Sequence, residues 1–192
     1  MQDSAHAEGA GTTASGANSH SEGAGTTASG SNSHCEGSGS IASGSYSHAE
    51  GTSTTAKGAG AHAEGLGNRT LSITIGATTI TGSGALGDGS HSEGNKTWAI
   101  GTSSHAEGEQ TRAQAQGSHA EGGSTIASNS YTHAEGYETV ASGDKSHAEG
   151  YDSVASGGCA HAEGYNTTAS GLDSHAEGGH TTASANYAHA EG

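Results

Sequence analysis

The chain has 192 residues, of which 35 are glycine and none is phenylalanine or proline, and its formal net charge is −15. So few large apolar side chains exclude an ordinary globular hydrophobic core. Twenty acidic residues oppose only five basic ones, which excludes a phosphate-binding surface, and we expect no nucleic-acid partner.

A fourteen-residue repeat begins next to the N-terminus and runs through nearly the whole chain. Histidine recurs every fourteen residues from His6 to His62 and again from His91 to His189, each time with glutamate two residues later and then glycine. The full repeat reads Ser-His-Ala-Glu-Gly-x-x-Thr-x-Ala-Ser-Gly-x-x. Its two halves share the pattern Ser/Thr-x-Ala-x-Gly-x-x, which is the length of one short strand and one turn.

The alternation within each half predicts where the side chains point. Successive side chains of a strand lie on opposite faces, so Ser or Thr and Ala share one face while His and Glu share the other. Two strands per coil with their small faces together form a β-solenoid whose coils stack on one another. The glycine density disfavours a helix, because glycine costs about 1 kcal/mol per helical position, and Val140 and Ile126 favour strands.

We therefore expect one all-β solenoid domain with a single interruption. Residues 1–65 and 91–192 carry the repeat, and residues 66–90 form an irregular insertion. The step from His62 to His91 is 29 residues, two coils plus one. Apolar and polar residues alternate in Leu71–Ile75 and Thr79–Thr81, which fits a local hairpin or two shortened coils. The segment is either an insertion that the solenoid tolerates at a turn or a specific contact site.

The two cysteines and the chain ends give few constraints. Cys35 replaces an interior alanine and Cys159 lies on a turn. Because many coils also separate them along the solenoid, we expect no disulfide between them. No apolar stretch is long enough to span a bilayer, so we expect no membrane contact by this segment, and any anchor to lie outside this chain.

The repeat resembles the YadA-like head domain of trimeric autotransporter adhesins, whose coil motif is close to Asn-Ser-Val-Ala-Ile-Gly followed by Ser-x-Ala-x-Gly. His stands where that family has Val, and Glu where it has Ile. The apolar version also occurs in this chain at Ser72–Gly76, Ala85–Gly87 and Trp98–Gly101. The His-Ala-Glu-Gly variant is similar to repeats in phage tail proteins of Gram-positive hosts.

The resemblance implies a left-handed parallel β-roll of fourteen-residue coils, with three chains around one axis. It also implies an adhesive head or a spacer rod of a surface adhesin or a phage tail fibre, outside the cell at a cell surface or on a virion tail. The implied partners are two further copies of the chain and a host-surface or matrix ligand. No enzymatic activity and no cofactor are implied.

The repeated His-x-Glu pairs form what we call the His/Glu ladder, which by the resemblance faces the trimer axis. Thirteen equal copies argue against catalysis, because an active site is one constellation with distinct roles. Three interpretations stay open: hydrogen bonding between His and Glu at the axis, a solvent-facing ladder, or occasional metal ions held by three symmetry-related histidines. The ladder consists of His6, Glu8, His20, Glu22, His34, Glu36, His48, Glu50, His62, Glu64, His91, Glu93, His105, Glu107, His119, Glu121, His133, Glu135, His147, Glu149, His161, Glu163, His175, Glu177, His189 and Glu191.

Two further features have functional alternatives. Tyr137, Tyr151 and Tyr165 follow the glycine of three successive coils and should stack as an aromatic ladder, which either stabilises the turns or contacts a ligand. His180 lies in a turn outside the His/Glu ladder, and we expect it to be solvated.

Regular threonine pairs raise an ice-binding solenoid as an alternative function. Such pairs occur at Thr12–Thr13, Thr26–Thr27 and Thr54–Thr55. Against it, the outward row is interrupted later in the chain by Trp98, Arg112, Val140 and Val154.

Pairing of His with Glu also predicts a pH dependence. A nearby carboxylate favours the charged imidazole while burial disfavours it, and we expect pairing to win. The His pKa would then rise and the Glu pKa would fall, which places maximal stability on the mildly acidic side.

Overall fold

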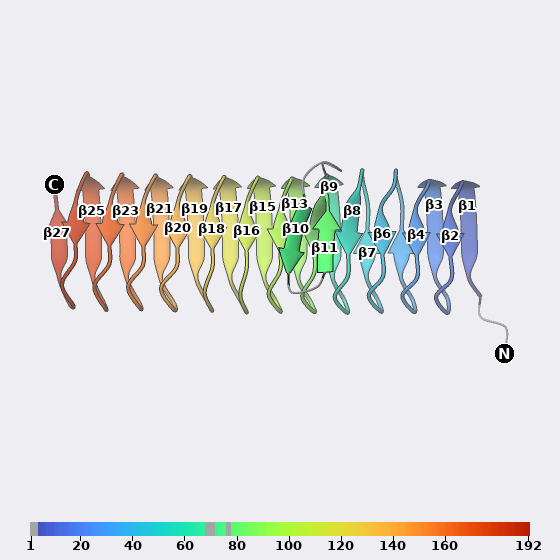
Figure 1. Ribbon diagram of the computed structural model, residues 1–192, viewed down its shortest axis with the longest axis horizontal. Coiled ribbons are helices and arrows are strands. Elements are labelled where there is room, and N and C mark those ends of the chain that lie inside the picture. The colour runs from blue at the N-terminus through green and yellow to red at the C-terminus, as the bar shows by residue number, and fades with distance from the viewer. Residues whose placement is uncertain (1–3, 68–71, 76–77) are drawn as a thin grey trace. The chain divides into compact units, whose positions relative to one another are not determined.

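The computed structural model describes residues 4–67, 72–75 and 78–192, and every regular element in them is a β-strand. The chain divides into two compact units, Met1–Ser103 and Ser104–Gly192. In each unit the strands alternate between two parallel sheets, with two strands per fourteen-residue coil (Figure 1). This confirms the predicted parallel β-solenoid. Within the described ranges, no helix could cross a membrane.

In the first unit, the ladder histidines begin the strands of the first sheet. This sheet consists of β1 (His6–Ala10), β3 (His20–Ala24), β5 (His34–Cys35), β7 (His48–Ala49), β9 (His62–Leu66) and β13 (His91–Asn95). The second sheet consists of β2 (Thr13–Ala14), β4 (Thr27–Ala28), β6 (Ile41–Ala42), β8 (Thr54–Ala56), β12 (Ser83–Ala85) and β14 (Trp98–Ala99).

The second unit repeats the arrangement without interruption. Its first sheet consists of β15 (His105–Glu109), β17 (His119–Gly123), β19 (His133–Tyr137), β21 (His147–Tyr151), β23 (His161–Tyr165), β25 (His175–Gly179) and β27 (His189–Glu191). Its second sheet consists of β16 (Arg112–Ala113), β18 (Ile126–Ala127), β20 (Val140–Ala141), β22 (Val154–Ala155), β24 (Thr168–Ala169) and β26 (Thr182–Ala183).

Small side chains fill the interior between the sheets, as the alternation predicts. Most alanines of the second-sheet strands, for example Ala141 and Ala155, have no exposed surface. The largest fully buried side chains are threonines. Buried hydroxyls need hydrogen-bond partners, and Thr167 Oγ1 donates to Ser153 Oγ at 2.9 Å, while Ser33 Oγ donates to the Gly30 carbonyl at 2.7 Å. The interior therefore combines alanine packing with hydroxyl hydrogen bonds.

The two glycines of the repeat have different surroundings, and Ala115 and Asn129 replace the second of them in their coils. The glycine after Glu has a positive φ, as at Gly150 with φ 99°, in a region that other residues rarely adopt. The glycine of the second half does not, but a Cβ on Gly157 would lie 1.9 Å from the carbonyl oxygen of Gly171 in the next coil. In the turn that follows, the positive φ falls on a residue with a side chain, such as Cys159 with φ 54°.

The interruption of the repeat contains an antiparallel hairpin, the first of the two alternatives for this segment. Strands β10 (Ser72–Ile75) and β11 (Thr78–Thr81) pair with each other in a separate two-stranded sheet. Leu71 and the Gly76–Ala77 turn lie outside the described residues. Since His62 pairs directly with His91, the 29-residue step is one coil with fifteen additional residues rather than two coils plus one.

Candidate functional site

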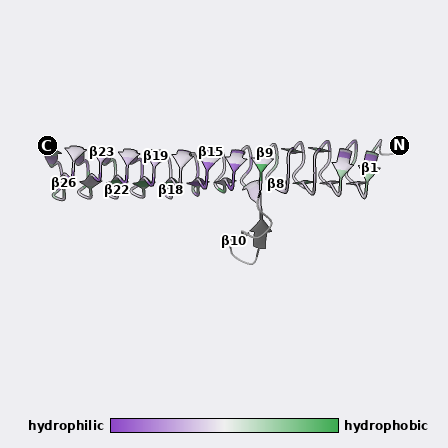
Figure 2. Ribbon diagram, turned by 90° about the horizontal axis from the view of Figure 1, so that it is seen from above, coloured by the Kyte–Doolittle hydropathy of each residue, from purple (hydrophilic) through white to green (hydrophobic). Residues whose placement is uncertain are grey.

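The His/Glu ladder is the most regular polar feature of both units. Parallel pairing places each ladder residue beside its equivalent one coil away, as in His147 with His161 and Glu149 with Glu163. Imidazole rings of successive coils stack with centroids 4.7–5.0 Å apart in the second unit and 4.8–5.1 Å apart in the first. Figure 2 colours these strands as hydrophilic, for example β15. The repeat thus builds a column of stacked imidazoles beside a column of carboxylates.

The Nε2 atoms of the ladder point at carboxylate oxygens. Nε2 of a ladder histidine lies 3.4–3.9 Å from Oε2 of the glutamate in its own coil. His161 Nε2 also lies 3.8 Å from Oε1 of Glu149 in the preceding coil, as close as it lies to Oε2 of Glu163. Most of these distances exceed that of a hydrogen bond, so within one chain most of these contacts are electrostatic, whereas His189 Nε2 and Glu177 Oε1 form a hydrogen bond of 3.3 Å.

Many of these nitrogens are shielded from water without a hydrogen-bond partner. About a third of the side chain is exposed at ladder residues such as His119 and His161, but their Nε2 atoms are covered by neighbouring atoms. A buried polar atom without a partner is costly, so this face is incomplete in a single chain. In the described part of the chain, the Nε2 atoms without such a partner include those of His20, His34, His48, His62, His119, His133, His147, His161 and His175.

The expected rise in the histidine pKa is wrong for five members of the ladder. Burial lowers the pKa of each of them below 6.5, and a stacked histidine next to it lowers the pKa further, outweighing the nearby carboxylates. A base whose pKa is lower in the folded chain than in the unfolded chain destabilises the fold once the pH falls below its pKa in the unfolded chain. These histidines are His48, His119, His133, His147 and His161.

Neighbouring glutamates shift the pKa values of one another along their column. A side-chain hydrogen bond to Glu163, together with burial and a hydrogen bond to Glu135, raises the pKa of Glu149 to about 7. Hydrogen bonds from Glu149 lower the pKa of Glu163 and, against the effect of burial, that of Glu135. Burial raises the pKa of Glu121. The expectation of lowered Glu pKa values therefore holds at Glu163 and Glu135 and is wrong at Glu149 and Glu121.

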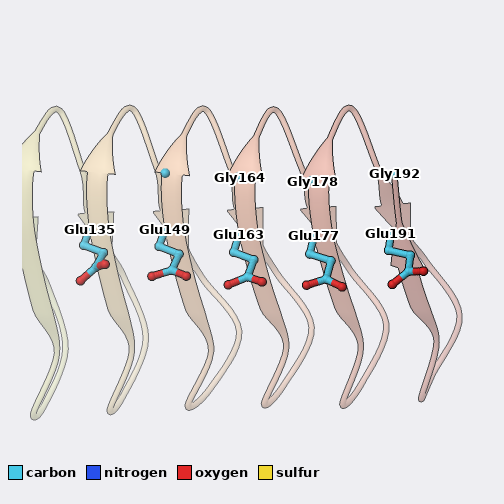
Figure 3. A pocket seen from close by; sticks show the side chains of 9 residues that line it. Glu135, Glu149, Glu163, Gly164, Glu177, Gly178, Glu191 and Gly192 are labelled. Carbon is cyan, nitrogen blue, oxygen red and sulfur yellow. The ribbon is translucent and has the colours of Figure 1, made fainter.

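These carboxylates line an open groove of about 640 Å³ in the second unit, together with the glycines that follow them. The carboxylates all project toward the same side of the strands (Figure 3). Because equal charges repel at this spacing, the row gains from any cation that lies between two of its members. A shared proton is the smallest such cation. The lining residues are Glu135, Glu149, Gly150, Glu163, Gly164, Glu177, Gly178, Glu191 and Gly192.

Glu149→Gln should stabilise the chain at pH 8.5 and leave it unchanged at pH 5.5, in buffer containing EDTA. A carboxyl with a raised folded pKa stabilises the fold fully below its ordinary value of 4.5, and the contribution is lost as the pH rises through about 7. Glutamine stays neutral, so the melting temperature at pH 8.5 should rise by about 2 to 4 °C, equivalent to about 1 kcal/mol. Circular dichroism at both pH values measures this.

The matched control is Glu138→Gln, which removes the same charge from an exposed turn residue outside the ladder. Its effect on the melting temperature should be equal at the two pH values. An equal effect of Glu149→Gln at both pH values would contradict proton sharing along the column.

The remaining candidate residues have simple positions. Tyr137, Tyr151 and Tyr165 end their strands and stack with ring centroids 5.5 and 5.2 Å apart. His180 is exposed, but its ring also meets the edge of Tyr165 at 5.1 Å. Both cysteines are free, with Cys35 buried and Cys159 exposed, as expected.

The threonine pairs do not form double outward rows. Thr26 and Thr54 are fully buried, because the first residue of each pair points into the interior and only the second points outward. Trp98 stands in the outward row, in register with Gly84 and Thr55, and its indole is itself buried, with 4% exposed. An ice-binding surface therefore loses half of the threonines on which it was based.

Sequence analysis missed the contacts between glutamates. It paired each carboxylate with histidine alone and gave no attention to the carboxylates of the adjacent coils. The signal was present, since a fourteen-residue period in a parallel solenoid places identical side chains in register and like charges side by side.

Comparison with known proteins agrees with this architecture. A family model described as the YadA head domain repeat matches residues 7–33, 134–158 and 162–187. A search of curated proteins gives no match.

Proposed function

We propose that this chain, which carries YadA head domain repeats, is an adhesive head or spacer rod of a trimeric surface adhesin or phage tail fibre. Repeats of this family are structural modules of cell-surface adhesins and are generally not enzymes. We further propose that the roll is left-handed and that three copies associate around one axis. The host-facing partner is then a surface or matrix ligand, outside the cell.

The main support for a trimer is the polar face formed by the His/Glu ladder, whose hydrogen bonds are incomplete within one chain. The ladder occupies the positions at which the family has Val and Ile, and the nine Nε2 atoms named above are covered yet lack hydrogen-bond partners within one chain. Each coil offers the same donors and acceptors at the same level, so a second and third copy can meet the ladder coil by coil. Polar contacts that repeat in this way also favour one register between copies.

The chain should have three times its monomer mass in solution, about 55 kDa from 18.5 kDa. Sedimentation equilibrium at several protein concentrations measures the mass, because oligomers follow mass action. A monomer at all concentrations would overturn the trimer and the axial position of the ladder.

Paired substitutions locate the interface. His147→Trp with His161→Trp should reduce the mass to that of a monomer, since three indoles at one level overfill the axis. Val140→Trp with Val154→Trp alters half-buried positions of the second sheet and should leave the mass unchanged. Dissociation by the second pair alone would place the interface on the other sheet.

A further inference from the structure

Two ladder nitrogens, those of His161 and His48, lie between carboxylate oxygens of two successive coils. His161 Nε2 is 3.8 Å from Oε1 of Glu149 and 3.8 Å from Oε2 of Glu163. In the first unit, His48 Nε2 is 3.5 Å from Oε1 of Glu36 and 3.8 Å from Oε2 of Glu50. One imidazole nitrogen with two carboxylate oxygens is a donor set typical of zinc and neighbouring divalent transition metals.

The separations are close to those that a metal ion requires. Zinc binds histidine nitrogen and carboxylate oxygen at about 2.0–2.2 Å, so two ligands of a tetrahedral site lie about 3.4 Å apart. The observed 3.5–3.8 Å exceeds this by a few tenths of an ångström. Because about a third of each of these side chains is exposed, small rotations can close the difference. Elsewhere in the ladder, His119, Glu121 and His133 also bring one ligand atom each within 4.8 Å of one another.

The Nε2 atoms of these histidines also have no other partner among the described residues that would compete with a metal ion. His48 and His161 both have Nε2 atoms that are covered and lack a hydrogen-bond partner. A metal ion binds neutral imidazole, and here it would also satisfy an otherwise isolated nitrogen.

We propose that the His/Glu ladder binds divalent transition-metal ions such as Zn²⁺, each held by Nε2 of one histidine and by one carboxylate oxygen from the glutamate of its own coil and one from the preceding coil. All three ligands come from a single chain, so the site does not depend on the trimer. A fourth position is left for water or for a neighbouring copy.

Charge sets the occupancy. Two carboxylates neutralise one divalent ion, and ions in adjacent coils would repel at the ladder spacing of 4.7–4.8 Å and compete for one carboxylate. Ions in alternate coils, at His133, His161 and His189 for example, use each glutamate once. Thirteen ladder glutamates then bind about six ions per chain.

Titration of the untagged full chain with Zn²⁺ tests the proposal. Isothermal calorimetry at pH 7.5 should give about six ions per chain by the same charge count, and EDTA should reverse the binding. Mg²⁺, which prefers oxygen ligands and retains water, should give no comparable signal. In nuclear magnetic resonance of chain labelled with ¹⁵N-histidine, Zn²⁺ should shift the Nε2 resonances of ladder histidines. Equal binding of Mg²⁺, or Nε2 resonances that Zn²⁺ does not shift, would overturn the proposal, and both tests use the chain with its sequence unaltered.

A triple variant of the ladder and a double control variant localise the ions. A ladder variant with Glu149→Gln, His161→Gln and Glu163→Gln should bind at least one Zn²⁺ fewer by equilibrium dialysis. The control combines Glu138→Gln with His180→Gln, which are exposed and outside the ladder, and should bind as many ions as the unaltered chain. An equal loss in both variants, or in neither, would refute ladder binding.

The same samples separate this proposal from the trimer. A monomer that binds Zn²⁺ through Nε2 supports the metal site and rejects the trimer. A trimer that binds no Zn²⁺ rejects the metal site alone.

Discussion

Ala155→Leu should abolish the cooperative thermal unfolding of the chain. Ala155 has no exposed surface and pairs with Ala141 and Ala169 in the adjacent coils, in an interior filled by Ala, Ser and Thr. A leucine there adds three carbon atoms to a space between two sheets that cannot separate without breaking the pairing of neighbouring coils. Overpacking of this kind costs about 3 kcal/mol or more, a large part of typical stability. Circular dichroism during heating measures the outcome.

The control is Val154→Thr in the same strand. Val154 points outward and is half-buried, and the same position holds threonine in the next coil, at Thr168. Its melting curve should match that of the unaltered chain. Equal tolerance of both substitutions would show that the inward and outward faces of the strand are reversed.

Gly157→Ala should also destabilise the chain severely, although it adds a single methyl group. The new Cβ would lie 1.9 Å from the carbonyl oxygen of Gly171 and 2.5 Å from its carbon. Both atoms belong to the backbone of the next coil, so neither can rotate away. Relief requires the turn or the adjacent coil to shift. Since Ala115 and Asn129 show that the position can hold a side chain in other coils, we expect a loss of about 2 to 3 kcal/mol. Thermal and urea unfolding measure it.

Gly179→Ala provides the matched comparison. No atom lies within 4 Å of the Cβ it would add, and its backbone φ is outside the left-handed region. In the preceding coil the paired position is occupied by Tyr165. Replacing glycine where the backbone allows alanine stabilises by about 0.4–1 kcal/mol through the unfolded chain. A comparable loss from both substitutions would mean that coil contact is not the reason for glycine at position 157.

The period and the small interior residues sufficed to predict the coil. Alternation placed Ala141 and Cys35 inside, and the structure buries both. The role of the second glycine was not predictable in this way, because the approach of Gly157 to Gly171 depends on how closely two turns stack. Sequence spacing gives the order of residues along a coil, but not the distance between backbones.

The candidate site was predictable in its members but not in its electrostatics. The recurrence of His and Glu predicted a ladder, and its residues lie in register. Whether an imidazole is charged depends on the balance of burial, stacked histidines and carboxylates around it, and at His119 burial has the largest effect. That balance changes with small rotations of side chains that a repeat pattern does not encode.

Because parallel pairing is in register, the fold of a coil does not depend on how many coils the chain contains. Each strand of the second unit bonds only to strands fourteen residues before and after it, as His147 does to His133 and His161. Duplication or loss of one complete repeat therefore leaves the remaining coils paired, with ladder histidines and glutamates still beside their equivalents. Gene segments encoding single coils can be gained or lost during replication while the protein still folds, so related chains can differ in reach without any change in how a coil is made.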